Sequence, residues 1–196
     1  DLGRFAELRG IREEGDEIVI GATTTHHEVL HDPLVARHAR LLAEATATVA
    51  DPQIRHRGTL GGSLAHADPA GDLAAPAVAL DATLRVVGPA GIRTLTAEEF
   101  FQDYFTTALD AGEILAEIRI PKHTEWAARY EKFHRAAQQW SIVGVAANVK
   151  YVRISEAPRP YFYLPLAQAY RPIVIVHARP SAAGAAPTTS ASSSSS

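Results

Sequence analysis

IRHRGTLGGSLAHADPAGD, from Ile54 to Asp72, is the stretch that says most about how this chain folds. At its centre, Gly61 and Gly62 lie between the hydroxyl residues Thr59 and Ser63. Two residues without a Cβ atom let backbone amides approach an anion closely, and the hydroxyl groups add donors. The pattern predicts a tight loop whose amides point into one concave site, suited to a phosphate or a flavin side chain.

The glycine pair alone leaves a plainer interpretation open, since such pairs are common in turns that bind nothing. Arg55 and Arg57 raise the positive potential beside it and favour an anion. The stretch lacks both the Gly-Lys-Thr end of a P-loop and the GxGxxG spacing of a dinucleotide fingerprint. A turn and an anion cradle are therefore both compatible with this pattern.

Helices are predicted on both sides of the glycine pair. Apolar residues recur at intervals of three and four from Leu34 to Val49, which predicts a helix that stops at Asp51-Pro52. Thr25 and Thr96 are each followed three residues later by Glu, a pattern typical of a capping box at a helix start. A further short helix is predicted at 72–80.

Strands are predicted at 17–21, 83–87, 114–120, 127–133 and 142–149. In the third of these, Ile114, Ala116, Ile118 and Ile120 alternate with Leu115, Glu117 and Arg119, which predicts one buried face. Because strands and helices are mixed without strict βαβ alternation, the predicted fold class is α+β.

The sequence changes character near Tyr151. Prolines recur from Pro158 to Pro180, and the chain closes on serines at 192–196. We expect 155–196 to pack poorly, because proline removes backbone donors and breaks apolar periods. The last ~15 residues should be disordered, since they carry too little apolar surface to offset ordering costs of roughly 1–2 kcal/mol per residue.

Composition narrows the classes of function. The net charge is −3 without clustered Lys and Arg, so no nucleic-acid partner is expected. The sequence has no cysteine, which excludes disulfides and iron–sulfur clusters held by its own thiolates. It shows no signal peptide and no apolar run of the roughly 18–20 residues that cross a bilayer. These features favour a soluble cytoplasmic domain that lacks its natural start.

The whole stretch from Ile54 to Asp72 resembles the second flavin-binding motif of the molybdenum hydroxylase flavoproteins, which read like IRNxGTxGGNLAHADPxxD. His56 and Ser63 depart from that motif but keep hydrogen-bonding ability. Further resemblances lie at 21–26, 113–121, 130–135 and 142–146, and the match runs from about Leu2 to about Asn148. The chain looks like a fragment of the FAD-binding (medium) subunit of the carbon monoxide dehydrogenase and xanthine dehydrogenase type.

The resemblance implies FAD as the cofactor and a set of residues that hold it. The amides and hydroxyls from Thr59 to Ser63 would hold the pyrophosphate and ribityl region, and Asp72 would accept a hydrogen bond from a sugar hydroxyl. Val49 would lie against the adenine, Leu115 would pack the flavin, and His134 falls near a basic position of some relatives. The implied cofactor-binding residues are Val49, Thr59, Leu60, Gly61, Gly62, Ser63, Asp72 and Leu115.

The resemblance also implies a fold, a domain division and partners. Residues 1–122 would form the second subdomain of a vanillyl-alcohol-oxidase-like FAD-binding fold, without its N-terminal lobe. Residues 123–150 would begin a truncated C-terminal α/β domain, and 151–196 would be a divergent tail. The expected partners are a large molybdopterin subunit and a small 2Fe–2S subunit. Electrons would pass from the iron–sulfur clusters through FAD to an external acceptor.

Two other functions are weighed against this one. With half of the nucleotide site absent, the chain could be an inactive or interaction fragment that binds FAD at most weakly. His27 to His31 is also a literal HExxH, the zinc-protease signature. Asp32-Pro33 ends that helix at once and no third ligand follows at the usual spacing, so a helix start with solvated histidines is favoured.

Overall fold

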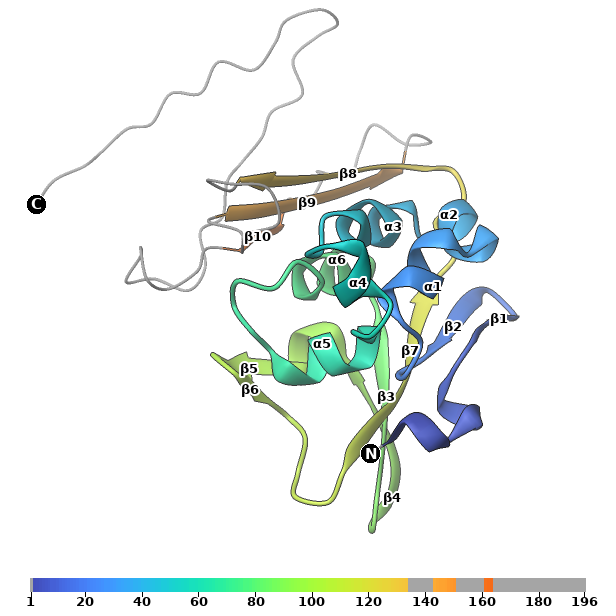
Figure 1. The fold of residues 1–196 in the computed structure, drawn as a ribbon, viewed down its shortest axis with the longest axis vertical. Coiled ribbons are helices and arrows are strands. Elements are labelled where there is room, and N and C mark those ends of the chain that lie inside the picture. The colour runs from blue at the N-terminus through green and yellow to red at the C-terminus, as the bar shows by residue number, and fades with distance from the viewer. Residues whose placement is uncertain (1, 134–142, 151–160, 164–196) are drawn as a thin grey trace, which may run out of the picture.

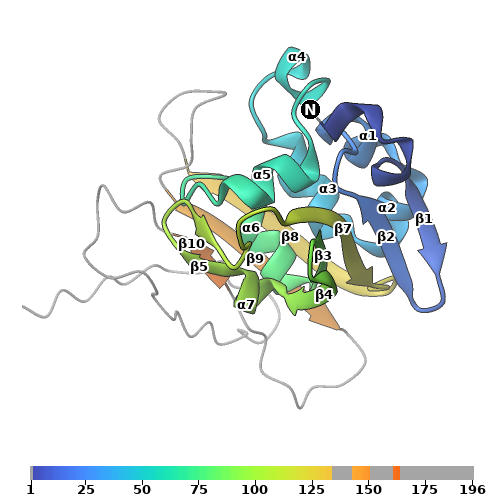
Figure 2. The same cartoon turned by 90° about the horizontal axis from the view of Figure 1, so that it is seen from below.

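The computed structural model describes residues 2–133, 143–150 and 161–163. In these residues a layer of short helices lies between two antiparallel sheets (Figure 1). Figures 1 and 2 both show β1 at one side of the molecule and β5 at the other. The predicted α+β class is confirmed.

The larger sheet has the order β1-β2-β7-β3-β4, and all neighbours are antiparallel. The central strand β7 pairs with β2 on one side and with β3 on the other, so strands that are distant in sequence are hydrogen-bonded to each other. The bounds are β1 Ile11–Glu14, β2 Glu17–Gly21, β3 Thr83–Gly88, β4 Gly91–Thr96 and β7 Ile114–Pro121. The predicted strands at 17–21, 83–87 and 114–120 are confirmed.

The predicted alternation along β7 is wrong at its start. Arg85 pairs with Glu117, but the next residue, Val86, pairs with Leu115, so Ala116 is an extra residue in a bulge. The bulge shifts the phase of the alternation by one residue. Leu115 therefore packs in the same hydrophobic core as Ile118, although strict alternation would put them on opposite faces.

The opposite face of β7 is covered by ion pairs. Glu117 is 8% exposed and pairs with Arg12 of β1, two strands away, at 2.7 Å and with Arg85 of the adjacent strand β3 at 3.2 Å. Arg119 reaches Glu14 and Glu17 in the same way. The alternation pattern predicts that the Glu117 and Arg119 face of β7 is exposed to solvent. In the structure, these ion pairs bury much of that face.

Short helices pack between the sheets. Thr25 and Thr96 form both predicted capping boxes, at the starts of α1 and α7. The helices are α1 His26–His31, α2 Pro33–His38, α3 Arg40–Ala47, α4 Pro52–Arg55, α5 Leu60–His66, α6 Ala74–Ala79 and α7 Ala97–Phe100, after two 3-10 turns, η1 Leu2–Arg4 and η2 Ala6–Leu8. The helix predicted at 72–80 is therefore present but shorter.

The single helix predicted from Leu34 to Val49 is two helices, broken at Ala39 (φ −137°, ψ 50°). The break frees the carbonyl of His38, which accepts a hydrogen bond from the backbone N–H of His123 at 2.9 Å. The end of β7 is thereby joined to the helical layer. Apolar periodicity continues across the break because both helices bury residues in one core.

The second sheet has the order β10-β9-β8 and contacts α3 and α6 (Figure 1). Its strands are β8 Trp126–Phe133, β9 Val143–Lys150 and β10 Tyr161–Tyr163, so the strands predicted at 127–133 and 142–149 are confirmed with small shifts. Tyr161–Tyr163 form β10, which pairs with Gly144–Ala146, so the expectation that 155–196 packs poorly is wrong for these three residues. Its three residues lie between prolines and are not interrupted by them. The rest of that segment, like His134, lies outside the described residues.

A two-stranded ribbon of β5 Phe101–Asp103 and β6 Thr106–Thr107 completes the fold. Its turn contains Phe105, which has a positive φ of 53° and is 58% exposed. The amide of Phe105 donates to the carbonyl of Ala67 at 3.0 Å, so the ribbon is joined to the C-terminal end of α5. None of the helices in the described part of the chain has the length and apolar character of a membrane span.

Candidate functional site

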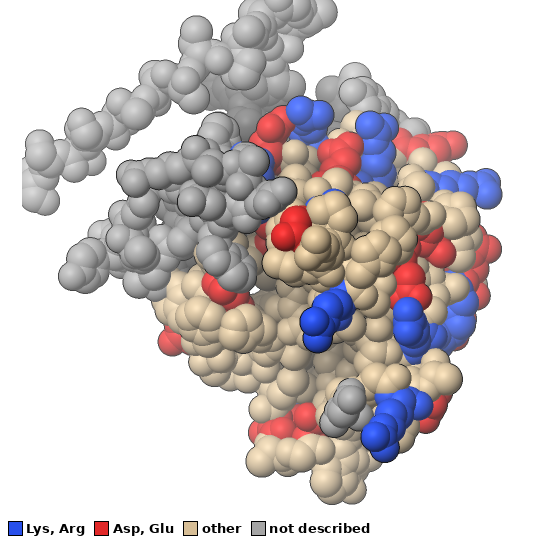
Figure 3. Space-filling view, viewed as in Figure 1, with Lys and Arg blue, Asp and Glu red and all other residues tan. Residues whose placement is uncertain are grey.

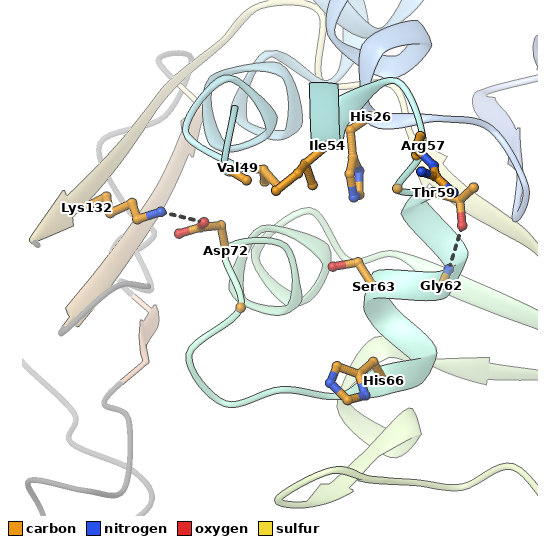
Figure 4. A pocket seen from close by; sticks show the side chains of 13 residues that line it. His26, Val49, Ile54, Arg57, Thr59, Gly62, Ser63, His66, Asp72 and Lys132 are labelled. Carbon is orange, nitrogen blue, oxygen red and sulfur yellow. Dashed lines mark hydrogen bonds and ion pairs between the residues drawn. The ribbon is translucent and has the colours of Figure 1, made fainter. Parts of the chain in front are cut away.

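A cavity of about 500 Å³ opens between α1, α4, α5 and strand β8 of the second sheet (Figure 4). Most of its wall comes from the stretch between Val49 and Asp72, and one side chain, Lys132, comes from β8. Its lining residues are His26, Val49, Ala50, Ile54, Arg57, Gly58, Thr59, Gly62, Ser63, His66, Gly71, Asp72 and Lys132.

The prediction of a tight loop at Thr59–Ser63 is wrong, because these residues begin helix α5. Thr59 is its N-cap, and the Thr59 hydroxyl accepts the Gly62 amide at 3.1 Å. The Leu60 and Gly61 amides donate to the carbonyls of Thr24 and Ala22, both at 2.9 Å. The amides of Leu60, Gly61 and Gly62, which were predicted to cradle an anion, thus have partners within the protein.

The two glycines have different tasks. A Cβ atom at Gly61 would lie 2.4 Å from the Cβ and 2.7 Å from the carbonyl oxygen of Ala22, so this glycine allows α5 to pack against the chain after β2. Gly62 faces the cavity, and a Cβ there would meet only the Thr59 hydroxyl, at 2.7 Å. A side chain at position 61 would therefore clash with Ala22.

The structure gathers most, but not all, of the sequence-predicted site residues. Val49, Thr59, Gly62, Ser63 and Asp72 line the cavity. The other three lie in the interior, with Leu60 1% and Leu115 4% exposed and Gly61 against Ala22. The bulge in β7 explains the burial of Leu115.

Asp72 forms the far wall of the cavity together with β8. Its carboxylate accepts the Tyr130 hydroxyl at 2.9 Å and lies 2.8 Å from Lys132 Nζ. Burial and the neighbouring carboxylate raise the pKa of Tyr130. Asp72 does not cap the next helix, because the N-cap of α6 is Leu73 and has no side-chain cap bond.

Polar groups gather at the other side of the cavity, where Figure 4 shows Arg57, Thr59, Ser63 and His26 around one space. The first three can donate hydrogen bonds from a guanidinium and two hydroxyls. His26 is 4% exposed, and its Nδ1 atom is buried without a hydrogen-bond partner among the described residues. Burial, and then the charge of Arg55, lower the pKa of His26 to about 4, so the ring is neutral near pH 7.

His26 and Lys132 are pocket residues that sequence reasoning did not assign. Lys132 could have been found, because Tyr130 and Lys132 are two residues apart on a predicted strand and so share a face. Nothing local marks His26. Its position depends on the pairing of Thr25 with Thr59 and on the hydrogen bond from its amide to the Gly58 carbonyl at 2.9 Å.

The HExxH segment, His27–His31, lies in the short helix α1. The Glu28 carboxylate closes the capping box with Thr25 and accepts three hydrogen bonds from Arg9, at 2.8, 2.9 and 3.3 Å. His31 Nδ1 lies 2.8 Å from the carbonyl of His27. Glu28 therefore acts as a capping residue and as the ion-pair partner of Arg9. The described part of the chain contains no group of three or more His, Cys, Asp or Glu placed to hold a metal ion.

Charge is distributed unevenly over the face seen in Figure 3. Lys and Arg alternate with Asp and Glu along the side where β1 and β2 lie, while the face over α4 and α5 is mostly uncharged. Basic residues do not gather into a stripe on this face, as a nucleic-acid-binding surface would require.

Comparison with known proteins gives consistent matches. Residues 1–123 match the family described as FAD binding domain in molybdopterin dehydrogenase. The chain is 41% identical over 165 residues to the carbon monoxide dehydrogenase medium chain of Hydrogenophaga pseudoflava, covering 79% of this chain and 57% of that protein. It is 38% identical over 147 residues to the corresponding chain of Afipia carboxidovorans, covering 74% and 51%.

Solved structures agree with these sequences. Carbon monoxide dehydrogenase from Hydrogenophaga pseudoflava superposes with a TM-score of 0.77 at 39% identity, covering 82% of this chain and 57% of that one. Quinoline 2-oxidoreductase from Pseudomonas putida 86 superposes with a TM-score of 0.75 at 31% identity, covering 80% and 55%. The chain spans about half the length of the curated relatives it matches.

Proposed function

This chain belongs to the family of FAD-binding domains in molybdopterin dehydrogenases, and we propose from that membership that its cavity holds FAD for electron transfer in a molybdenum-containing dehydrogenase. Flavin, when bound, supplies chemistry that accepts and passes on electrons, while the protein binds and orients it. The observation that carries the proposal is the clustering of the motif residues Thr59, Gly62, Ser63 and Asp72 around one cavity.

The residues present fit a dinucleotide. A cavity of about 500 Å³ lies within the usual range for small-molecule sites. Arg57 and the hydroxyls of Thr59 and Ser63 offer donors to a pyrophosphate, while Asp72 offers acceptor oxygens to a sugar hydroxyl. Val49 and Ile54 provide apolar surface between these two ends for a flat ring (Figure 4).

Leu60, Gly61 and Leu115 belong to the proposed cofactor-binding residues but lie in the interior, where they support the site without lining the cavity. Leu60 and Gly61 fix the start of α5 through their bonds to Thr24 and Ala22. Leu115 packs in the same hydrophobic core as Leu60 and Leu64 of α5. We therefore assign to these three residues the shaping of the site and to the lining residues its contacts with FAD.

The proposed partners are a large molybdopterin subunit and a small 2Fe–2S subunit, in the cytoplasm. Relatives are named as medium chains of carbon monoxide dehydrogenase and of glyceraldehyde dehydrogenase, which supports a multi-subunit assembly. This sequence has no cysteine, so in this proposal the iron–sulfur clusters belong to another polypeptide. Electrons would then pass from those clusters through FAD to an external acceptor.

Titration of the purified full chain with FAD, followed by flavin fluorescence up to millimolar concentration, tests the proposal. We expect saturable binding that Ser63→Ala weakens, because the Ser63 hydroxyl lines the cavity. Thr94→Ala, on the exposed strand β4, is the matched control and should bind like the parent chain. A parent chain that shows no saturable binding would support the alternative of an interaction fragment without flavin.

A further inference from the structure

His26 occupies an unusual position for a neutral polar side chain. It is the first residue of α1, is 4% exposed and lines the cavity. Its Nδ1 atom is buried and has no hydrogen-bond partner among the described residues. Figure 4 shows the ring pointing into the cavity above Ser63. A buried N–H donor without an acceptor is costly, so the surroundings of Nδ1 bear on where the ring carries its proton.

The backbone around the ring is built to admit it. A Cβ atom at Gly58 would lie 2.9 Å from Cδ2 and 3.0 Å from Nε2 of His26, closer than side chains normally approach. The amide of His26 donates to the carbonyl of the same Gly58. Gly58 therefore both anchors the backbone of His26 and leaves space for the Nε2 edge of its ring.

The unpartnered Nδ1 atom decides where the ring carries its proton. A neutral imidazole has one N–H donor and one acceptor nitrogen. An N–H on Nδ1 would be buried with no acceptor among the described residues, whereas an N–H on Nε2 can meet a ligand in the cavity. The tautomer with the proton on Nε2 is therefore favoured, and it makes His26 a hydrogen-bond donor.

We propose that His26 is a cofactor-binding residue, which donates a hydrogen bond from Nε2 to a pyrophosphate oxygen of FAD. The inference rests on the proposed function and adds a residue to it. A phosphate oxygen is the acceptor that suits this side of the cavity, because His26 shares it with the guanidinium of Arg57 and the hydroxyls of Thr59 and Ser63. The acceptor oxygens of Asp72 lie at the far side, where a hydroxyl group fits better.

Two substitutions at His26 separate binding from structure. His26→Leu removes both ring nitrogens at similar volume, and His26→Gln keeps an amide nitrogen at about the distance of Nε2 from the backbone. His31→Leu, an exposed histidine of the same helix, is the control. FAD affinity by fluorescence titration and the thermal unfolding midpoint are measured for the full chain and each variant.

We expect His26→Leu to weaken FAD binding tenfold or more, the usual effect of losing a hydrogen bond to a charged group. Its unfolding midpoint should be unchanged or higher, because an unpartnered buried polar atom is replaced by an apolar group. His26→Gln should recover most of the affinity. Parent-like affinity in His26→Leu overturns the inference, as does a lowered unfolding midpoint with no recovery in His26→Gln.

A second measurement does not depend on FAD. Nitrogen-15 NMR of the free chain should show the proton of His26 on Nε2, and a proton on Nδ1 would overturn the inference. The two proposals also fail differently in the titration. A parent chain that does not bind FAD removes the proposed function and this inference with it, whereas equal binding by the parent chain and His26→Leu removes only the inference.

Discussion

Lys132 Nζ lies 2.8 Å from Asp72 Oδ2, and the two side chains are only 5% and 6% exposed. The pair joins β8 to the loop between α5 and α6, and Tyr130 on the same strand adds a hydrogen bond to the other carboxylate oxygen. Asp72 also lines the cavity. One wall of the candidate FAD site is therefore attached to the second sheet by buried charges.

Removal of one partner from this ion pair should be strongly destabilising. Lys132→Met leaves the Asp72 carboxylate buried with its ion-pair partner lost, and breaking a buried pair costs roughly 3–5 kcal/mol. Arg129→Met is the matched control, because Arg129 pairs with Glu131 at the surface with its side chain 72% exposed, and such pairs contribute about 0–1 kcal/mol. Urea unfolding of the full chain measures both. Equal losses in the two variants would show that the Asp72–Lys132 pair is not buried in solution.

The double variant Asp72→Leu/Lys132→Met tests whether the loss comes from the uncompensated charge. Replacing both partners by apolar groups removes the desolvation cost that a single substitution leaves behind. The loss of free energy of unfolding in the double variant should therefore be smaller than the sum of the losses in Asp72→Leu and Lys132→Met, by about 1 kcal/mol or more. Strict additivity would mean that the two side chains do not interact.

The adjacent glycines should respond differently to substitution. Gly61→Ala places a methyl group 2.4 Å from the Cβ of Ala22, and overpacking of this kind costs roughly 1–3 kcal/mol or more. In Gly62→Ala the new methyl group meets only the Thr59 hydroxyl and weakens the N-cap of α5, at a cost of about 1 kcal/mol. The better helix propensity of alanine contributes about 1 kcal/mol in the opposite direction, so the two effects offset each other.

Thermal unfolding and FAD titration of the two glycine variants check this. Gly61→Ala should lower the unfolding midpoint, whereas Gly62→Ala should keep it and weaken FAD binding, since its methyl group enters the cavity. The reverse assignment, with Gly62→Ala unfolding first, would contradict the packing of α5 against Ala22.

Local patterns accounted for the elements that depend on neighbouring residues. The capping boxes at Thr25 and Thr96 need residues three apart, and the strand at 17–21 needs only a short apolar run, so the sequence was enough to predict them. Tertiary contacts determined the rest. The bulge at Ala116 and the break at Ala39 have no local signal, because both follow from pairing with distant backbone.

The candidate site shows the same division. The motif from Thr59 to Asp72 was predicted to form one site, and five of the eight residues named for it line one cavity. The geometry at its centre differs, since the two glycines lie in helix α5 rather than in a loop, where Gly61 packs against Ala22 and Gly62 faces the cavity. His26 and Lys132 come from α1 and β8, and only the folded chain brings them to Asp72 and Ser63.

The cap of α1 should contribute measurably to stability. The Thr25 hydroxyl accepts the Glu28 amide, and the Glu28 carboxylate also binds the Thr25 amide and Arg9. Thr25→Ala should lower the free energy of unfolding by about 0.5–2 kcal/mol, whereas Thr25→Ser, which keeps the oxygen, should lower it by less. Chemical denaturation distinguishes the two. If serine is as harmful as alanine, the threonine methyl group rather than the cap is responsible.

His26 should also make stability depend on pH. Its pKa is about 4 in the folded chain, against an ordinary value of 6.5, so between these values the unfolded chain binds more protons. The contribution of His26 to the free energy of unfolding is therefore fully present above pH 6.5 and is lost as pH decreases toward 4. The loss is up to roughly 3 kcal/mol, at 1.36 kcal/mol per pKa unit. Burial also lowers the pKa of His123, which adds a loss of the same sign.

Comparison of the parent chain with His26→Leu isolates the contribution of His26 to this acid loss. Urea unfolding at intervals between pH 7 and 4 should show a shallower decline in the variant, while the part due to His123 persists in both. The carboxylates of Glu14 and Glu117, whose pKa values are lowered by their arginine partners, lose their contribution mainly below their ordinary value of 4.5 and so act at the acid end of this range. Parallel curves for the two chains from pH 6.5 to 5 would show that the ring of His26 is accessible to protons in the folded state, contrary to its buried position beside the cavity.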